Sequence, residues 1–187
     1  IVATVFAIVI AKLLFGGFGQ NIFNPAAVGR ALILQAFTGV SVGLVTYATP
    51  TTTIASTYHW LPANAGVLDA FLKTINGTNK GTFLDLALGN YPGSLGETFT
   101  ILILIVGVVL AIRQIIDWRV PVVYLGTIFV LTAVVAAITG IESYHGIPAV
   151  IWYPLLHILT GGVVFGAVFM LTDPVTSPTS ASGRVVF

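Results

Sequence analysis

The chain has 187 residues, of which 57% are hydrophobic and only 7% charged, and its formal net charge is +1. Soluble domains carry about a quarter charged residues, so this composition and a mean hydropathy of +1.03 exclude a soluble protein and indicate an integral membrane protein. The seven Lys and Arg residues are scattered singly, which argues against a nucleic-acid partner. The absence of cysteine excludes disulfides, thiolate zinc sites and cysteine-held iron–sulfur clusters within these residues.

Apolar runs approaching the roughly 20 residues needed to cross a bilayer recur along the chain. We predict spans over residues 1–15, 26–43, 97–112, 120–140 and 147–171, the last interrupted by Pro154, His157 and Gly161-Gly162. The chain opens and closes within apolar runs, so we expect further helices beyond both ends. These features predict an all-α integral membrane protein, a multi-span helical bundle with broken helices, in which residues 1–187 form one transmembrane domain.

A long polar connection over residues 44–96 separates the second and third spans, with short helices predicted around 67–72 and 83–88. The short turn 113–119 contains two arginines and a tryptophan, which favours the cytoplasmic side by the positive-inside rule. The connection 44–96 is then extracytoplasmic, and Asp173 lies in the cytoplasmic half.

Two stretches resemble variants of one element and predict an internal structural repeat. Each contains a glycine pair, a polar residue before proline and a Gly-Arg pair: Gly16-Gly17, Asn24-Pro25 and Gly29-Arg30 in the first, and Gly161-Gly162, Asp173-Pro174 and Gly183-Arg184 in the second. Such residues break helices and expose helix ends that can hold polar ligands. Duplicated broken helices are typical of membrane proteins that bind or move something at membrane depth.

Several long motifs, in order and at similar spacing, resemble the NqrB/RnfD family. They occupy residues 11–30, 93–98, 117–119 and 161–175. Members of this family are flavin-carrying membrane subunits of the Na⁺-translocating NADH:quinone reductase and of the Rnf complex. The Gly19-Gln20-Asn21 and Ala48-Thr49-Pro50 triplets look closer to the Rnf branch. The resemblance extends in fold to urea-transporter-like proteins, with their broken-helix repeats.

The resemblance implies FMN attached covalently through its phosphate to a threonine, in a motif of the form Asp-x-x-Ser/Thr-Gly-Ala-Thr. The matching residues are Thr46, Tyr47, Ala48 and Thr49, so Thr49 is the candidate acceptor. Proline at position 50 biases Thr49 toward an extended backbone. Tyr47 stands where the motif has glycine, and Gly43 stands where it has aspartate. The alternative is an unmodified polar loop.

Three polar residues near the broken elements are candidate ligands of a cofactor or an ion. Arg30 either binds a flavin or quinone oxygen or pairs with Asp173. Asp173 is a candidate ion-pathway residue, with helix N-capping as the alternative. Asn24 is assigned to a cap and to the cofactor site, whereas Glu97, before a span, is given a structural role.

The three histidines lie far apart in the sequence and lack metal-ligand spacing, so we predict no metal site. We also predict no catalytic side chain, because a bound flavin would do the redox chemistry. His157 lies in an apolar span, where a hydrogen-bonded structural role competes with a proton role.

Together, the resemblance implies an electron-carrying, multi-pass subunit of a bacterial or archaeal cytoplasmic membrane complex, and not a complete enzyme. Its expected partners are lipid, a flavin transferase and other subunits, including one with a second covalent flavin. The resemblance also extends to members that hold unattached riboflavin, for which the broken helices are the candidate place. The alternative function is a non-redox channel or transporter, in which broken helices line a pore and Thr49 is an ordinary loop residue.

Overall fold

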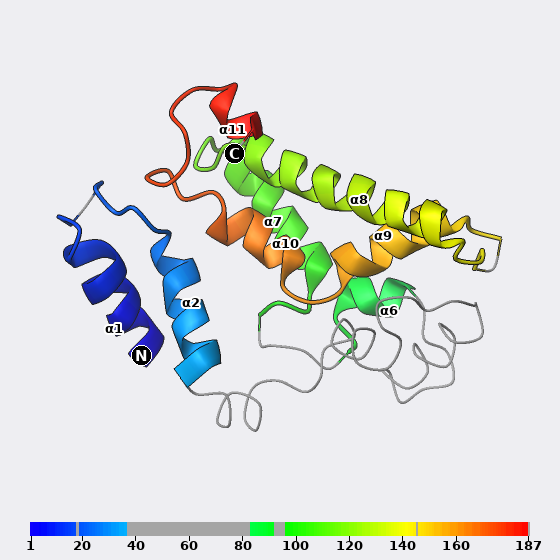
Figure 1. Ribbon diagram of the computed structural model, residues 1–187, viewed down its shortest axis with the longest axis horizontal. Helices are drawn as coiled ribbons and strands as arrows, with labels where there is room; N and C mark the ends of the chain where they lie inside the picture. Colours follow the sequence, from blue (N-terminus) through cyan, green and yellow to red (C-terminus); the bar gives the residue numbers. More distant parts are fainter. Residues whose placement is uncertain (18, 37–82, 92–95, 145, 187) are drawn as a thin grey trace.

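The computed structural model describes residues 1–17, 19–36, 83–91, 96–144 and 146–186 (Figure 1). Within these ranges the regular elements are helical, apart from one isolated bridge between Tyr144 and Ile147. The α-helices are α1 (Val2–Ile8), α2 (Pro25–Ala36), α6 (Phe83–Leu88), α7 (Thr100–Ile112), α8 (Arg119–Thr139), α9 (Ala149–Leu159), α10 (Val163–Phe165) and α11 (Gly183–Val186). Two π-helical segments, η1 (Val9–Leu13) and η2 (Gly166–Met170), continue α1 and α10.

Helix α8 has 21 residues, which at 1.5 Å per residue give about 30 Å, the thickness of a bilayer's hydrocarbon core. Among the described residues it is the one helix long and apolar enough to span a membrane by itself. Helix α9 and the segment α10–η2 form a pair bent by 71°, and this bent pair is a second span if its two parts cross the membrane together. The stretches Val2–Leu13 and Thr100–Ile112 are apolar but shorter.

The predicted span 120–140 and the predicted short helix at 83–88 are confirmed by α8 and α6. The predicted span 97–112 begins later, at Thr100. The second predicted span is described only as far as Ala36, and the predicted helix at 67–72 lies outside the described residues.

The interruption of the last predicted span lies at the glycine pair alone. Helix α9 runs through Pro154 and His157, so the prediction of breaks at these two residues is wrong. The helix ends at Leu159, Thr160 after it has an extended backbone, and Gly161 follows with φ at 72°. Glycine adopts this left-handed conformation without steric cost and commonly stops a helix, whereas proline removes one helical hydrogen bond and here leaves the helix continuous.

Two apolar clusters hold the bent pair in place. The larger cluster joins α6, α8 and α9 and the loops beside them through Leu86, Tyr91, Ala136, Tyr144, Trp152 and Leu156. The smaller cluster joins Ile103 of α7 to Val164 of α10 and Val168 of η2. Figure 1 shows α8 and α9 side by side, and α1 and α2 as a second pair near the N-terminus. The bent pair is thus wedged between α7 and α8.

Candidate functional site

Asn24 joins the two broken elements. Its side-chain Oδ1 accepts hydrogen bonds from the amides of Ala26 at 2.9 Å and Ala27 at 3.2 Å, which caps the start of α2. Its Nδ2 donates to the carbonyl of Met170, the last residue of η2. The predicted cap is confirmed, and the same side chain ties the first element to the second.

Arg30 forms an ion pair with Glu97, through Nη1 and Oε1. The predicted pairing of Arg30 with Asp173 is therefore wrong. The Glu97 side chain is only 10% exposed, and a carboxylate in such surroundings requires a cationic partner, whereas the Arg30 side chain stays 41% exposed.

Asp173 is satisfied locally. Its Oδ2 accepts a hydrogen bond from the Thr176 hydroxyl at 2.9 Å, and its backbone carbonyl accepts one from the Ser177 amide at 3.2 Å. These contacts close a turn in which no α-helix begins, so the alternative prediction of helix N-capping at Asp173 is also wrong. A nearby hydroxyl and a tight turn suffice for a partly exposed carboxylate.

The break between α9 and α10 lies directly against Glu97. A Cβ atom at Gly162 would be 2.9 Å from Cδ and Oε2 of Glu97, a separation that real side chains avoid. Glycine therefore permits the backbone of the break to approach the carboxylate. We call the set of Arg30, Glu97 and Gly162 the break junction; it connects α2, the residues before α7 and the bent pair.

Hydroxyl groups bind the carbonyls at the end of α9. The hydroxyls of Tyr91 and Thr100 donate to the carbonyl of Leu159 at 3.2 Å and 3.4 Å, and the Thr160 hydroxyl donates to that of Leu156 at 2.6 Å. Because a broken helix in an apolar setting must have its backbone groups paired, these bonds stabilise the break.

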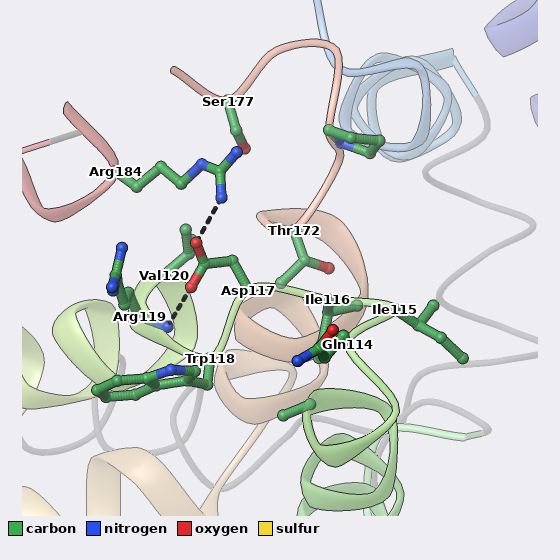
Figure 2. A pocket seen from close by; sticks show the side chains of 12 residues that line it. Gln114, Ile115, Ile116, Asp117, Trp118, Arg119, Val120, Thr172, Ser177 and Arg184 are labelled. Carbon is green, nitrogen blue, oxygen red and sulfur yellow. Dashed lines mark hydrogen bonds and ion pairs between the residues drawn. The ribbon is translucent and has the colours of Figure 1, made fainter. Parts of the chain in front are cut away.

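A separate cavity of about 440 Å³ lies between the turn after α7 and the segment 172–184. We call it the polar pocket; its polar lining consists of Gln114, Asp117, Arg119, Thr172, Ser177 and Arg184. Figure 2 shows the Asp117 carboxylate between the Arg184 guanidinium and the backbone nitrogen of Arg119. The pocket therefore gathers charged side chains from two segments far apart in the sequence.

Hydrogen bonds organise the Asp117 carboxylate. Its Oδ2 accepts from Nη1 of Arg184 at 2.5 Å and its Oδ1 accepts from the backbone amide of Arg119 at 3.0 Å. The hydrogen bond from Arg184 and that from the Arg119 amide hold the pKa of Asp117 below its ordinary value. Nε of Arg184 donates to the carbonyl of Pro178 at 2.9 Å, which anchors the segment before α11.

Four of the remaining predicted site residues are not covered by the structure. Thr46, Tyr47, Ala48 and Thr49 lie outside the described residues. Nδ1 of His157 lies 2.9 Å from the carbonyl of Tyr153, in line with the hydrogen-bonded role predicted for it.

Sequence reasoning missed the partners of the two Gly-Arg arginines. The Gly-Arg motif identified Arg30 and Arg184 as unusual, but it contained no signal for which carboxylate each would contact. Asp117 lies between two arginines in the turn 113–119, a pattern that indicated orientation but no distant partner. Glu97, given only a structural role, is the acidic partner of a candidate cofactor residue.

Helix α8 is long and apolar enough to span a membrane, and the break between α9 and α10 lies against the ion pair of Arg30 and Glu97. These features define a helical membrane protein with polar groups at a helix break. The chain belongs to the NQR2, RnfD, RnfE family, whose model matches residues 1–187. This match confirms the predicted family.

Relatives with curated names cover nearly the whole chain. It is 36% identical over 97% of its length to a subunit of the proton-translocating ferredoxin:NAD(+) oxidoreductase complex of Clostridium ljungdahlii. It is 33% identical over its full length to a subunit of the Na(+)-translocating ferredoxin:NAD(+) oxidoreductase complex of Acetobacterium woodii. It is 34% identical over 97% of its length to a subunit of the Na(+)-translocating NADH-quinone reductase of Pseudomonas aeruginosa. The chain spans 52%, 52% and 43% of these relatives, about half their length.

Proposed function

We propose that this chain is part of an electron-carrying membrane subunit of an ion-translocating oxidoreductase complex. The family match over residues 1–187 is the observation that carries the proposal. The matched relatives are named as subunits of such complexes, and the break junction supplies the polar groups that a cofactor or ion site at membrane depth would need. Other subunits of the complex are then its partners.

We further propose FMN, held as a phosphoester on Thr49, as the electron carrier. The support is the sequence motif, in which Thr46, Tyr47 and Ala48 precede the acceptor. When bound, the flavin supplies the redox chemistry, and the protein supplies its position and surroundings. A flavin transferase and a partner with a second flavin belong to the same proposal.

The contacts of Asn24 and Arg30 favour different roles for these two predicted cofactor residues. Asn24 uses its Oδ1 and Nδ2 to hold the two broken elements together, so we propose it as a scaffold residue. Arg30 pairs with Glu97 through one nitrogen while its side chain stays 41% exposed. Guanidinium has five N–H donors, so Arg30 retains donors for a flavin or quinone oxygen. Riboflavin near this point and an ion-pathway role for Asp173 are the remaining proposals.

Flavin attachment is tested on the full-length subunit, expressed with and without a flavin transferase. Intact mass and ultraviolet in-gel fluorescence should show a covalent flavin only with the transferase. Thr49→Ala should lose both signals and keep the melting temperature of the parent, whereas Thr53→Ala, a matched threonine in the same connection, should keep both. Retention of the flavin mass by Thr49→Ala would refute this acceptor.

The same preparations separate the carrier from the alternative function. Flavin missing from both, together with solute uptake by liposomes that contain the subunit, would favour the channel or transporter. The bent pair of α9 and α10–η2 would then line a permeation path.

A further inference from the structure

The polar pocket carries an excess of positive charge that the proposed electron-carrying function does not use. Two guanidinium groups, those of Arg119 and Arg184, and one carboxylate, that of Asp117, line it. Arg184 is committed to Asp117 and to the carbonyl of Pro178. Within the parts of the chain that the structure describes, the Arg119 guanidinium forms no ion pair, and it lies 6.0 Å from the ring centroid of Trp118.

An apolar groove opens beside the polar pocket. It has a volume of about 130 Å³ and is lined on the α8 side by Pro121, Val122 and Leu125, and on the α7 side by Leu104 and Val108. Three residues, Ala111, Ile116 and Trp118, line both the groove and the pocket, so the two spaces adjoin. The polar pocket therefore adjoins an apolar groove that lies between α7 and α8.

The position of the two spaces matches the boundary of a bilayer. The polar pocket lies at the start of α8, the spanning helix, and the groove follows the α7 and α8 side chains toward its middle. Trp118, 58% exposed, stands where the two spaces meet, and tryptophan is enriched at membrane interfaces. The arginine-rich turn favours the cytoplasmic leaflet, which carries anionic lipid.

We propose that the polar pocket binds the phosphate of an anionic phospholipid, with Arg119 as its principal contact, and that one acyl chain lies in the apolar groove. The charges are complementary, because the two arginines and one aspartate leave one positive charge for the phosphate. The amide of Gln114 supplies further donors, whereas the hydroxyls of Thr172 and Ser177 donate to the carbonyls of Val168 and Leu171. Basic pockets between membrane helices are a known means of binding lipid headgroups. This proposal is independent of flavin attachment.

Native mass spectrometry of the full-length subunit in detergent tests the proposal, with dioleoyl phosphatidylglycerol and dioleoyl phosphatidylcholine as probes. We expect phosphatidylglycerol to be retained in preference to phosphatidylcholine. Arg119→Gln should reduce that retention by about tenfold, the effect of losing one hydrogen bond to a charged group. Arg113→Gln is the matched control, because it removes the same charge from the same turn and does not line the pocket.

A second pair of variants tests the acyl chain. Ala111→Phe fills the place where the pocket and the groove meet and should also reduce retention of phosphatidylglycerol. Val109→Phe, at an exposed position of the same helix outside both spaces, should leave it unchanged. If the melting temperature shows that Arg119→Gln does not fold, the comparison of Ala111→Phe with Val109→Phe decides. Equal retention of phosphatidylglycerol by these two variants would overturn the proposal.

Glycerol 3-phosphate distinguishes the lipid from a free phosphate. Under the proposal it competes weakly, because it lacks the chain that occupies the groove. Full competition, together with no effect of Ala111→Phe, would indicate a site for soluble phosphate and overturn the lipid proposal. Equal losses in Arg119→Gln and Arg113→Gln would indicate nonspecific attraction to the anionic surface and would overturn it as well.

Discussion

The two Gly-Arg motifs place the same residue types in different surroundings. Arg30 meets Glu97, whose side chain is 10% exposed, and the pair closes against the backbone of the helix break. Arg184 meets Asp117, whose side chain is 21% exposed, and the pair lines an open cavity. The first pair packs against the helix break, whereas the second lies beside the polar pocket and the guanidinium of Arg119.

The same Gly-Arg motif therefore has a different role at each of its two positions. Both pairs are partly buried, but removing Arg30 leaves a carboxylate that is 10% exposed, whereas removing Arg184 leaves one that is 21% exposed and better hydrated. We therefore expect the break junction to govern stability and the polar pocket to govern ligand binding. Substitutions at the two places test that division, and those at the break junction should have the largest effects.

Breaking the first pair should cost the most. Arg30→Ala leaves the Glu97 carboxylate almost buried and unpaired, and we expect the free energy of unfolding to fall by about 3 kcal/mol. Glu97→Ala should cost less, because Arg30 stays partly hydrated. Arg184→Ala, at the second pair, should cost about 1 kcal/mol or less, since both Arg184 and Asp117 are partly exposed. Denaturant unfolding in detergent measures all three.

Two controls sharpen this contrast. Glu142→Ala removes an exposed carboxylate and should be nearly neutral. The double variant Arg30→Met with Glu97→Met should regain part of the loss, because replacing both partners by apolar groups avoids the unpaired charge. Equal losses in Arg30→Ala and Arg184→Ala would remove the distinction between the two motifs.

Adding one methyl group at the break should disturb the first pair from the other side. The Cβ of Gly162→Ala would meet the Glu97 carboxylate at 2.9 Å and displace it from Arg30, with an expected cost of about 1 kcal/mol, because the end of a flexible side chain can move. Gly166→Ala is the matched control, because its Cβ meets no atom within 4 Å and alanine favours a helix. Thermal melting compares them, and similar melting temperatures would contradict the close contact.

Two substitutions at Asn24 separate the cap from the link between elements. Asn24→Ala loses both and should cost about 1 kcal/mol. Asn24→Asp keeps an oxygen that caps α2 but replaces the donor to the Met170 carbonyl by an acceptor. If the link matters, Asn24→Asp should also be destabilised; a wild-type melting temperature for it would show that the cap alone counts.

The second pair should add a small pH dependence. The hydrogen bond from Arg184 lowers the pKa of folded Asp117 below the ordinary value of 3.8, so folding favours the ionised form. Its contribution to stability is complete above that ordinary value and is lost as pH falls through the lowered pKa. Between about pH 5 and about pH 2, the melting temperature should fall less for Asp117→Asn than for the parent. An identical fall in both would exclude this contribution.

Local sequence signals predicted the elements that depend on neighbouring residues. The apolar run ending at Gly140 became α8, the short run at residues 83–88 became α6, and Asn24 before proline became a cap. The predicted interruption at Pro154 is wrong, because the loss of one hydrogen bond does not end a helix whose neighbouring side chains pack in the core. The flavin motif around Thr49 stays a prediction, since it lies outside the described residues.

The membrane class, the family and the presence of helix breaks could be predicted from composition, long motifs and glycine or proline pairs, because these are local properties of the chain. The folded arrangement was needed to show that Arg30 pairs with Glu97 and Arg184 with Asp117, and that Asp173 pairs with neither arginine. It was also needed to show that a charged cavity adjoins an apolar groove. Partner choice depends on which helices pack together, and these partners lie far apart along the chain.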